Sequence, residues 1–236
     1  MNRKILSCCL AFFLVVSCTV SALTYNSKTA STNATATNSK PVIILDAGHG
    51  GEDGGAVSDS GLVEKDVNLQ IALILQKFFV QSGFEVVMTR SDDRAIYSDD
   101  ATTLREKKVS DIHNRADICN SDDNNIFISI HQNKFDQSKY NGTQVFYSSN
   151  NPLSSNLAEN IRAAVTETLQ PDNSRQCKPS TDSVYILKNA TVPAVLVECG
   201  FLSNTQEEAL LRTEQYRNQL AFVIFSGFLE FYYQYY

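Results

Sequence analysis

Short apolar runs alternate with longer segments of helical period between residues 41 and 236. Apolar and β-branched residues fill the runs, as they do in strands that are buried on both faces. The runs that predict strands lie at residues 42–45, 84–89, 125–131, 143–148, 184–187 and 194–197. The first helical pattern directly follows the first run and its loop, an order that is typical of a parallel sheet. We therefore predict a single α/β domain with a mostly parallel sheet of about six strands and helices on both faces.

The ends of the helical segments carry residues that commonly begin or end helices. Ser82-Gly83 ends the first pattern, where a glycine cap is expected. Capping boxes open the second and the last patterns at Thr103 and Thr205, and Asn151-Pro152 precedes the third pattern. The last pattern is expected to break near Thr213 before it continues toward the C-terminus.

The N-terminal segment has the pattern of an export signal. Arg3 and Lys4 precede an apolar run at residues 5–16, which is too short to cross a membrane comfortably. We interpret residues 1–23 as a signal peptide or membrane anchor. The alternative is lipidation of Cys18, because the residues that precede it resemble a bacterial lipobox.

Composition and charge distinguish the following segments. Residues 24–40 are mostly Ser, Thr, Asn and Ala and are interpreted as a flexible linker. Residues 41–236, the expected catalytic domain, carry 16 basic and 26 acidic side chains, a net charge of −10. Such a domain is a poor match for a phosphate backbone, so we exclude nucleic acid as a partner. Its three cysteines have spacings of neither a zinc cluster nor a disulfide framework, and we interpret them as buried or idle thiols.

A glycine-rich loop after the first strand contains the first candidate for chemistry. Five of the ten glycines lie within residues 48–55, so the backbone there is expected to turn tightly or to approach another group closely. His49 lies in the middle of this loop, at the end of a rigid strand, where metal ligands and catalytic groups are commonly held. Glu64 follows near the start of the first helix, where the helix dipole favours a carboxylate.

Two further candidates follow the ends of later strands. His131 ends the run at residues 125–131, and Glu198 directly follows the run at residues 194–197. Because active sites of open α/β sheets form at the carboxyl ends of strands, we expect these residues to lie near His49 and Glu64. Two imidazoles and one carboxylate are the ligand set of a catalytic zinc site, and a second carboxylate nearby would be the general base.

Each candidate also has a purely structural interpretation. A lone histidine at a strand end is more often a satisfied structural residue than a ligand, and Glu64 alone would be an ordinary helix-start carboxylate. His113 lies on a helix beside a core stripe, so we interpret it as a surface or boundary residue. Glu198 is harder to explain in this way, because it follows four apolar residues where a carboxylate would be desolvated without a partner.

Four segments that contain these residues carry a resemblance to a known family. They read Val-Ile-Ile-Leu-Asp-Ala-Gly-His49-Gly-Gly, Leu-Val-Glu64-Lys-Asp-Val-Asn-Leu, Ile-Ser-Ile-His131-Gln-Asn and Val-Leu-Val-Glu198-Cys-Gly-Phe-Leu-Ser-Asn. In this order they resemble the zinc-dependent N-acetylmuramoyl-L-alanine amidases, over essentially all of residues 41–236. The resemblance implies that His49, Glu64 and His131 bind one zinc ion, that Glu198 is the catalytic glutamate, and that the sheet is mostly parallel and six-stranded.

The resemblance also implies a substrate and a place of action. These enzymes hydrolyse the amide bond between the lactyl group of N-acetylmuramic acid and L-alanine in peptidoglycan. The short, single-domain form is most similar to the spore cortex and germination amidases, which implies that the bared muramic acid is a precursor of muramic-δ-lactam. We accordingly expect an exported protein, associated with the cell wall or membrane and acting around the developing spore.

The connection between the third and fourth strands bears on regulation. Cell-division members of this family carry an inserted helix that blocks the zinc site, and residues 132–144 are too few for one. We therefore expect a protein partner to activate or recruit the enzyme. The aromatic tail, residues 231–236, is a candidate docking surface, and its alternative interpretation is a last helical turn packed on its own core.

Two other functions are compatible with the candidate site. A zinc exopeptidase acting on ordinary peptides would use the same ligand set, although no Arg cluster for a free peptide terminus is evident. A non-catalytic wall-binding module would have a degenerate site, whereas all four expected residues are present.

Overall fold

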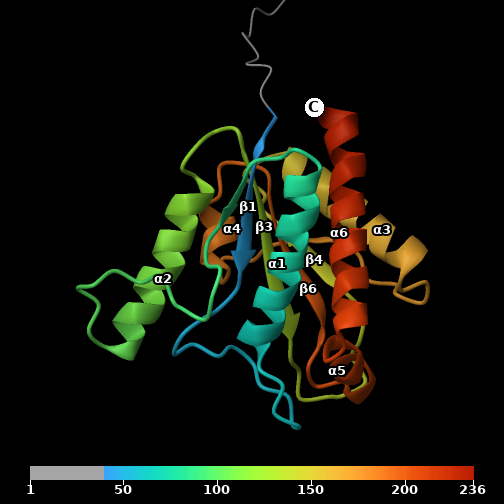
Figure 1. Cartoon of the computed structure of the whole chain (residues 1–236), viewed down its shortest axis with the longest axis horizontal. Helices are drawn as coiled ribbons and strands as arrows, with labels where there is room; N and C mark the ends of the chain where they lie inside the picture. Colours follow the sequence, from blue (N-terminus) through green and yellow to red (C-terminus); the bar gives the residue numbers. More distant parts are fainter. Residues whose placement is uncertain (1–39) are drawn as a thin grey trace, which may run out of the picture. The chain divides into compact units, whose positions relative to one another are not determined.

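The computed structural model describes residues 40–236 (Figure 1). The export segment expected at residues 1–23, including Cys18, and the linker as far as residue 39 lie outside the described residues. The described residues form one compact unit. Within the described part of the chain, no helix is both long enough and apolar enough to cross a membrane.

One six-stranded sheet forms the centre of the domain. Its strands are β1 (Val42–Ala47), β2 (Val86–Met88), β3 (Asn125–Asn133), β4 (Gln144–Tyr147), β5 (Lys178–Pro179) and β6 (Ala194–Phe201). They lie in the order β2-β1-β3-β6-β4-β5, and every pair is parallel except the antiparallel pair β4 and β6. The predicted mostly parallel sheet of six strands is therefore confirmed.

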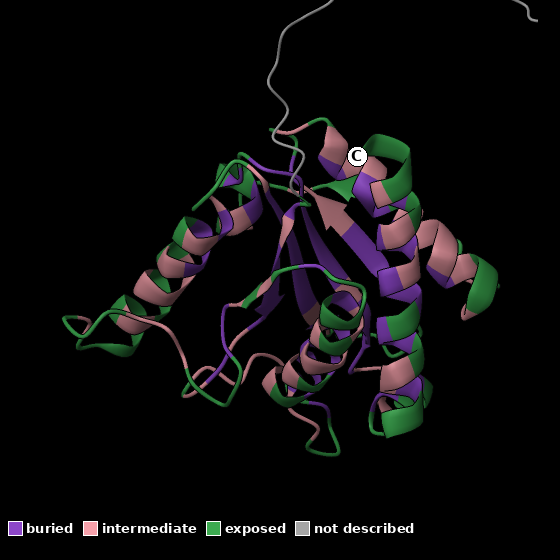
Figure 2. Ribbon diagram, turned by 45° about the horizontal axis from the view of Figure 1, so that its top comes forward, coloured by how far each residue is buried: buried purple, intermediate pink, exposed green. Residues whose placement is uncertain are grey.

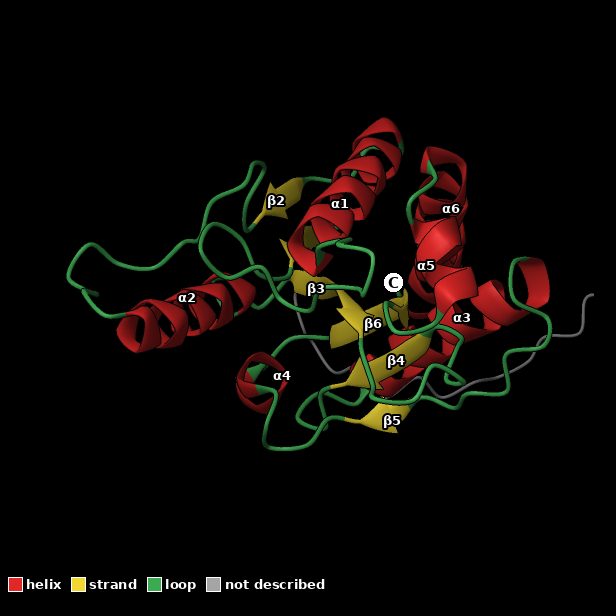
Figure 3. Ribbon diagram, turned by 90° about the horizontal axis from the view of Figure 1, so that it is seen from below, coloured by secondary structure: helices red, strands yellow, loops and turns green. Residues whose placement is uncertain are grey.

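Helices cover both faces of the sheet (Figure 3). They are α1 (Glu64–Gln81), α2 (Leu104–Cys119), α3 (Leu153–Thr168), α4 (Tyr185–Asn189), α5 (Thr205–Leu211) and α6 (Glu214–Tyr235). Side chains of β1 alternate between the faces, as the period of a strand requires. Ile43 and Leu45 belong to the larger core cluster, which contains residues of α1, α3 and α6. Ile44 belongs to a smaller cluster with residues of α2 and α4.

The strands at the centre of the sheet are buried on both faces, whereas the helices are exposed on their outer faces (Figure 2). This burial explains why β1, β3 and β6 are mainly apolar on both faces, with the buried Ser129 as a polar exception within β3. Because β1, β3 and β6 pair in parallel, their carboxyl ends lie at the same edge of the sheet.

Most helix ends follow the predicted signals. Thr103 forms a complete capping box with Glu106 at the start of α2, and Gly83 has a φ of 75° just after α1. The start of the last helical region differs by one residue, because Asn204 caps α5 by accepting hydrogen bonds from two backbone amides. The expected break near Thr213 separates α5 from α6, and the Thr213 side chain caps α6.

The strand predicted at residues 184–187 is wrong. Tyr185–Asn189 form the short helix α4, in which Leu187 is buried and Tyr185 is exposed. A four-residue apolar run is compatible with either structure, and here one helical turn buries Leu187 in the cluster shared with α2. The edge strand is instead β5, a two-residue pairing with β4 that has no apolar run to predict it.

Two smaller interpretations can be compared with the structure. Cys119 and Cys199 are buried, Cys177 is half-buried, and all three are free thiols, as interpreted from their spacing.

The aromatic tail continues α6 to Tyr235, and Phe231 is fully buried while Tyr233 is 79% exposed. The tail is therefore a last helical turn packed through Phe231 and through Tyr232, whose ring contacts Phe84 and Phe228, while Tyr233 and Tyr236 are exposed.

Candidate metal centre and active site

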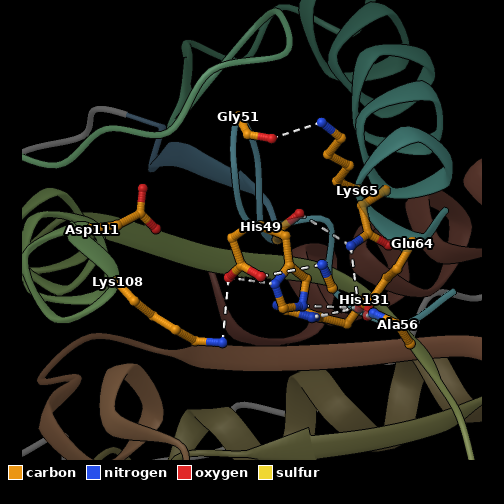
Figure 4. Close-up of polar contacts among 12 residues, drawn as sticks. His49, Gly51, Ala56, Glu64, Lys65, Lys108, Asp111 and His131 are labelled. Atoms are coloured by element: carbon orange, nitrogen blue, oxygen red, sulfur yellow. Dashed lines mark hydrogen bonds and ion pairs between the residues drawn. The ribbon is translucent and has the colours of Figure 1, made fainter. Parts of the chain in front are cut away.

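The carboxyl ends of β1 and β3 and the start of α1 bring three candidate residues together (Figure 4). His49 follows β1 by two residues, His131 lies near the end of β3, and Glu64 is the first residue of α1. The fourth candidate, Glu198, lies in β6 directly beside His131 in the strand register. The structure therefore places all four predicted residues at one edge of the sheet.

Three of these side chains direct polar atoms toward one point. His49 Nε2 lies 3.3 Å from Glu64 Oε1, and His131 Nδ1 lies 2.9 Å from the same oxygen. One ligand atom from each residue lies within 4.8 Å of the others, so the group could hold a metal ion. The two imidazole rings meet edge to face, with centroids 5.0 Å apart.

Two glycines allow the side chains to approach so closely. A Cβ atom at Gly48 would lie 2.2 Å from His131 Nε2, inside the volume of the ring. At Gly55, where φ is 68°, a Cβ atom would lie 2.6 Å from Glu64 Oε2. The close backbone approach expected from the glycine-rich loop is therefore present at these two positions.

His49 itself has a left-handed backbone. Its φ of 63° makes it the only described residue other than glycine with a positive φ. Such a conformation costs on the order of 1–3 kcal/mol and is maintained only where surrounding structure fixes it. Here it turns the imidazole back from the end of β1 toward Glu64.

A carboxylate in the same loop orients the His49 ring. His49 Nδ1 lies 2.9 Å from Asp53 Oδ2, which accepts its hydrogen bond when the proton is on that nitrogen. This bond occupies Nδ1, so the other ring nitrogen, Nε2, faces Glu64. A carboxylate behind a histidine in this way fixes the ring and increases its basicity as a metal ligand.

Several hydrogen bonds hold the Glu64 carboxylate in place. The backbone amide of Ala56 donates to Oε2 at 2.8 Å, and that of Gln132 donates to Oε1 at 3.1 Å. Asn68, one helical turn after Glu64, donates to Oε1 at 3.4 Å and to the Gly48 carbonyl at 3.2 Å. Glu64 is thus fixed by the loop, the helix and β3 together.

The pKa values of the cluster reflect its alternating charges. Burial lowers the pKa of His49, but hydrogen bonds and charges of Asp53 and Glu64 outweigh it and raise the pKa to about 9. Burial raises the pKa of Glu64, and bonds to His131 and His49 more than reverse this and hold it far below its ordinary range. The negative charges that favour a proton on the His49 imidazole would also favour a metal cation at this point.

A buried ion pair supports the loop from beneath. Arg115 of α2 is 3% exposed and contacts the fully buried Asp46 at the end of β1. It also donates to the carbonyls of Ala47 and His49, at 2.9 and 2.8 Å. Arg90 donates to the Ala47 and Gly48 carbonyls from the other side, so two guanidinium groups fix the backbone that carries His49.

Glu198 differs from the other carboxylates in lacking partners. Its Oε2 is buried and has no hydrogen-bond partner among the described residues. Burial raises the pKa of Glu198 to about 7, with the His131 and His49 charges opposing the shift and Glu64 adding to it. A carboxyl with a pKa near neutrality beside a cluster of ligands has the properties of a general acid and base.

A cavity of about 260 Å³ opens onto this cluster. Its lining includes His49, His131 and Glu198 on one side and the start of α4, with Tyr185, on the other. A substrate in this cavity would therefore reach both the metal-binding group and the unpartnered carboxylate.

Comparison with known proteins identifies the family. The family described as N-acetylmuramoyl-L-alanine amidase matches residues 43–230 of this chain. The chain belongs to this family. The amidase is 33% identical over 191 residues to the germination-specific N-acetylmuramoyl-L-alanine amidase of Bacillus subtilis (strain 168), a match that covers 81% of this chain and 79% of that protein.

Solved structures of related enzymes agree with this assignment. The CwlD amidase from Clostridioides difficile, solved in complex with the GerS lipoprotein, is 40% identical, with a TM-score of 0.78 and coverage of 81% of this chain and 98% of that chain. The N-acetylmuramoyl-L-alanine amidase AmiC2 of Nostoc punctiforme is 28% identical, with a TM-score of 0.70 and coverage of 83% and 98%. The resemblance inferred from the four segments is thus confirmed, and the chain is a peptidoglycan hydrolase.

The amidase site contains residues that sequence reasoning did not identify. Asp53 and Asn68 lie four residues after His49 and Glu64, a spacing that could have pointed to them, whereas Arg115 reaches the site from a distant helix. His113 is exposed and stacks on Tyr185 with ring centroids 4.5 Å apart, which agrees with its interpretation as a surface or boundary residue.

Proposed function

We propose that this amidase uses zinc, held by His49, Glu64 and His131, to cleave the bond between the lactyl group of muramic acid and L-alanine. The catalytic residue in this proposal is Glu198. The observation that carries the proposal is the convergence of three ligand atoms within 4.8 Å beside a buried carboxylate oxygen without a partner.

The donor set fits zinc. Two imidazole nitrogens and one carboxylate oxygen are the ligands of many catalytic zinc sites, which keep a fourth position for water or substrate. Asp53 behind His49 and the three hydrogen bonds to Glu64 supply the outer contacts that such ligands normally have. Zinc bound here would lower the pKa of water to about 7 and polarise the scissile carbonyl.

Glu198 supplies the proton transfers in this proposal. As a carboxylate it accepts a proton from the attacking water, and as a carboxylic acid it returns that proton to the departing nitrogen of L-alanine. A pKa of about 7 suits both tasks, because the group gains and loses a proton at comparable cost near neutral pH. The products are a glycan strand with a free lactyl carboxylate and a peptide with a free L-alanine amino group.

We further propose that the substrate is spore cortex peptidoglycan. Support comes from the germination-specific enzyme of Bacillus subtilis and from CwlD, both of which this chain matches over about four fifths of its length. Removal of the peptide would leave muramic acid ready for conversion to muramic-δ-lactam by a separate deacetylase. Action on the cortex requires an exported enzyme, with residues 1–23 as signal peptide or anchor and residues 24–40 as linker.

We also propose a protein partner. The CwlD structure contains the GerS lipoprotein, which supports an equivalent arrangement for this chain. No helix lies in the connection between β3 and β4 at residues 134–143, so a blocking helix at that place is not available for control. The exposed rings of Tyr233 and Tyr236 are the candidate contact, and deletion of residues 232–236 should weaken partner capture while the domain stays folded.

Product analysis tests the proposed reaction. Purified cortex peptidoglycan is incubated with the zinc-loaded amidase, and released peptides are analysed for a new L-alanine amino terminus by mass spectrometry. The proposal predicts these termini together with glycan strands that retain the lactyl group. Cleavage of free peptides with no release from the wall would contradict it and favour an exopeptidase.

A further inference from the structure

Among the described residues that line the active-site cavity, Lys108 is the only lysine or arginine with a largely exposed side chain. The described charged side chains that line the cavity are mostly acidic, and the other non-histidine cation is Arg115. The Arg115 side chain is 3% exposed and is occupied by Asp46, Asp111 and backbone carbonyls. The Lys108 side chain, by contrast, is 57% exposed.

The position of Lys108 is tied to the candidate metal ligands. Its Nζ lies 3.5 Å from Asp53 Oδ2, the same oxygen that lies 2.9 Å from His49 Nδ1 (Figure 4). The ammonium group is therefore two short contacts from the His49 ring. An ammonium group has three donors, so Lys108 can contact Asp53 and a second carboxylate at the same time.

Lys108 also lines a second cavity next to the active-site cavity. This neighbouring cavity has a volume of about 170 Å³, and Asp53, Lys108 and Asp111 line both cavities. Its wall includes the apolar side chain of Leu104 and the ring of Tyr97. A peptide that extends from the reaction centre past Lys108 would thus enter a partly apolar space.

The chemistry of the substrate supplies a carboxylate at a matching distance. In the peptidoglycan stem, L-alanine is followed by D-glutamate joined through its γ-carboxyl group, which leaves the α-carboxylate free in many walls and amidated in others. An extended chain spans about 3.5 Å per residue, so this carboxylate lies about 7 Å from the scissile nitrogen. Two contacts, of 3.5 and 2.9 Å through Asp53 Oδ2, place the Lys108 ammonium group within this range of the His49 ring.

We propose that Lys108 binds the free α-carboxylate of the second stem residue and makes the amidase selective for stems that carry it. The inference rests on the proposed function, because it places the scissile bond at the His49, Glu64 and His131 cluster. The third stem residue would then lie against Tyr97 and Leu104.

A matched pair of substrates tests the proposal. Disaccharide tripeptides that differ only in a carboxylate or carboxamide at the D-glutamate α-position are compared with the zinc-loaded wild type and with Lys108→Gln. Wild type should prefer the carboxylate by about tenfold in kcat/KM, as expected for a charge-assisted hydrogen bond. Lys108→Gln should abolish the preference through a higher KM for the carboxylate substrate, read as the ratio of the two substrates in enzyme of measured zinc content.

A control variant separates recognition from general charge effects. Lys188 is 49% exposed and pairs with Asp182 outside the cavity, so Lys188→Gln should keep the full preference. The proposal is overturned if Lys108→Gln keeps the preference, or if it slows both substrates equally, which would indicate a role through Asp53 alone.

Failure of the proposed function would give a different result. In that case wild type would cleave neither substrate, and calorimetry with the corresponding free stem peptides would decide the inference. Tighter binding of the carboxylate peptide by wild type than by Lys108→Gln would support recognition, and equal binding would refute it.

Discussion

His131 and Glu198 are direct register partners on the neighbouring parallel strands β3 and β6. Registered residues of adjacent strands project to the same face of a sheet, so the two side chains lie next to each other at the catalytic edge. The sheet core, and not a mobile loop, therefore sets the position of the proposed catalytic carboxylate relative to a proposed zinc ligand. His49 and Glu64 reach the same point from a loop and a helix start, which need additional support.

Asp53 should control how tightly zinc is held. Asp53→Asn removes the charge behind the His49 ring while preserving the size of the side chain. We expect zinc affinity to fall about 10- to 100-fold, as for other outer carboxylates of metal sites, when measured by competition with a chromogenic chelator. Glu52→Gln, an exposed neighbour that pairs with Lys107, should leave affinity unchanged. Equal affinity of Asp53→Asn and wild type would show that Asp53 does not act on the metal.

Gly48 should be intolerant of even one additional carbon atom. The methyl group of Gly48→Ala would lie 2.2 Å from His131 Nε2, so the ring must move away from Glu64. We expect loss of stoichiometric zinc and of turnover, measured by metal analysis and a wall-hydrolysis assay. Gly61→Ala is the control, because no atom lies within 4 Å of the added carbon, although its φ of 86° is positive and that of Gly48 is not. Full zinc content in Gly48→Ala would contradict the proposed position of His131.

The buried pair of Asp46 and Arg115 should make stability depend on pH. Burial alone would raise the pKa of Asp46, but Arg115, His131 and the hydroxyls of Ser129 and Thr89 outweigh it and lower the pKa below 3.8. The unfolded chain therefore binds this proton more readily than the folded chain. The stabilisation is complete above the ordinary pKa and is lost as the pH falls through the lowered value.

Asp46→Asn tests this dependence. At pH 7 the variant should lose on the order of 3 kcal/mol in free energy of unfolding, because the buried Arg115 charge loses its fully buried carboxylate partner and keeps only Asp111 as a counter-charge. Urea denaturation at pH 7 and pH 3 should show a smaller difference from wild type at the lower pH. Asp182→Asn, at an exposed pair, should differ little from wild type at either pH. A loss of equal size at both pH values would attribute the effect to packing instead of charge.

The sequence predicted the parts of this molecule that depend on local pattern. Mainly apolar runs identified β1, β3 and β6, and the ends of these runs indicated the positions of His49, His131 and Glu198. Residues 184–187 were misassigned because four apolar residues do not distinguish a strand from one helical turn. Which form occurs depends on the contact with α2, which is distant in the sequence.

The supporting residues could not be derived in the same way. Arg115 contacts Asp46 across 69 positions of sequence, and an arginine within a polar helix has no pattern that indicates burial. Lys108 gains its proposed role only because α2 lies beside the loop that carries Asp53. Such roles depend on the packing of elements, which is known only once the fold is known.

The central claim is that Glu198 transfers the proton at a zinc site made by the other three residues. Glu198→Gln keeps the shape of the side chain and does not alter the ligands His49, Glu64 and His131. Turnover of purified peptidoglycan is measured with wild type and variant that have both been shown to contain one zinc ion per chain. The account predicts equal zinc content and a loss of about 10²- to 10⁴-fold in kcat for the variant. Undiminished turnover by the zinc-loaded variant would contradict it.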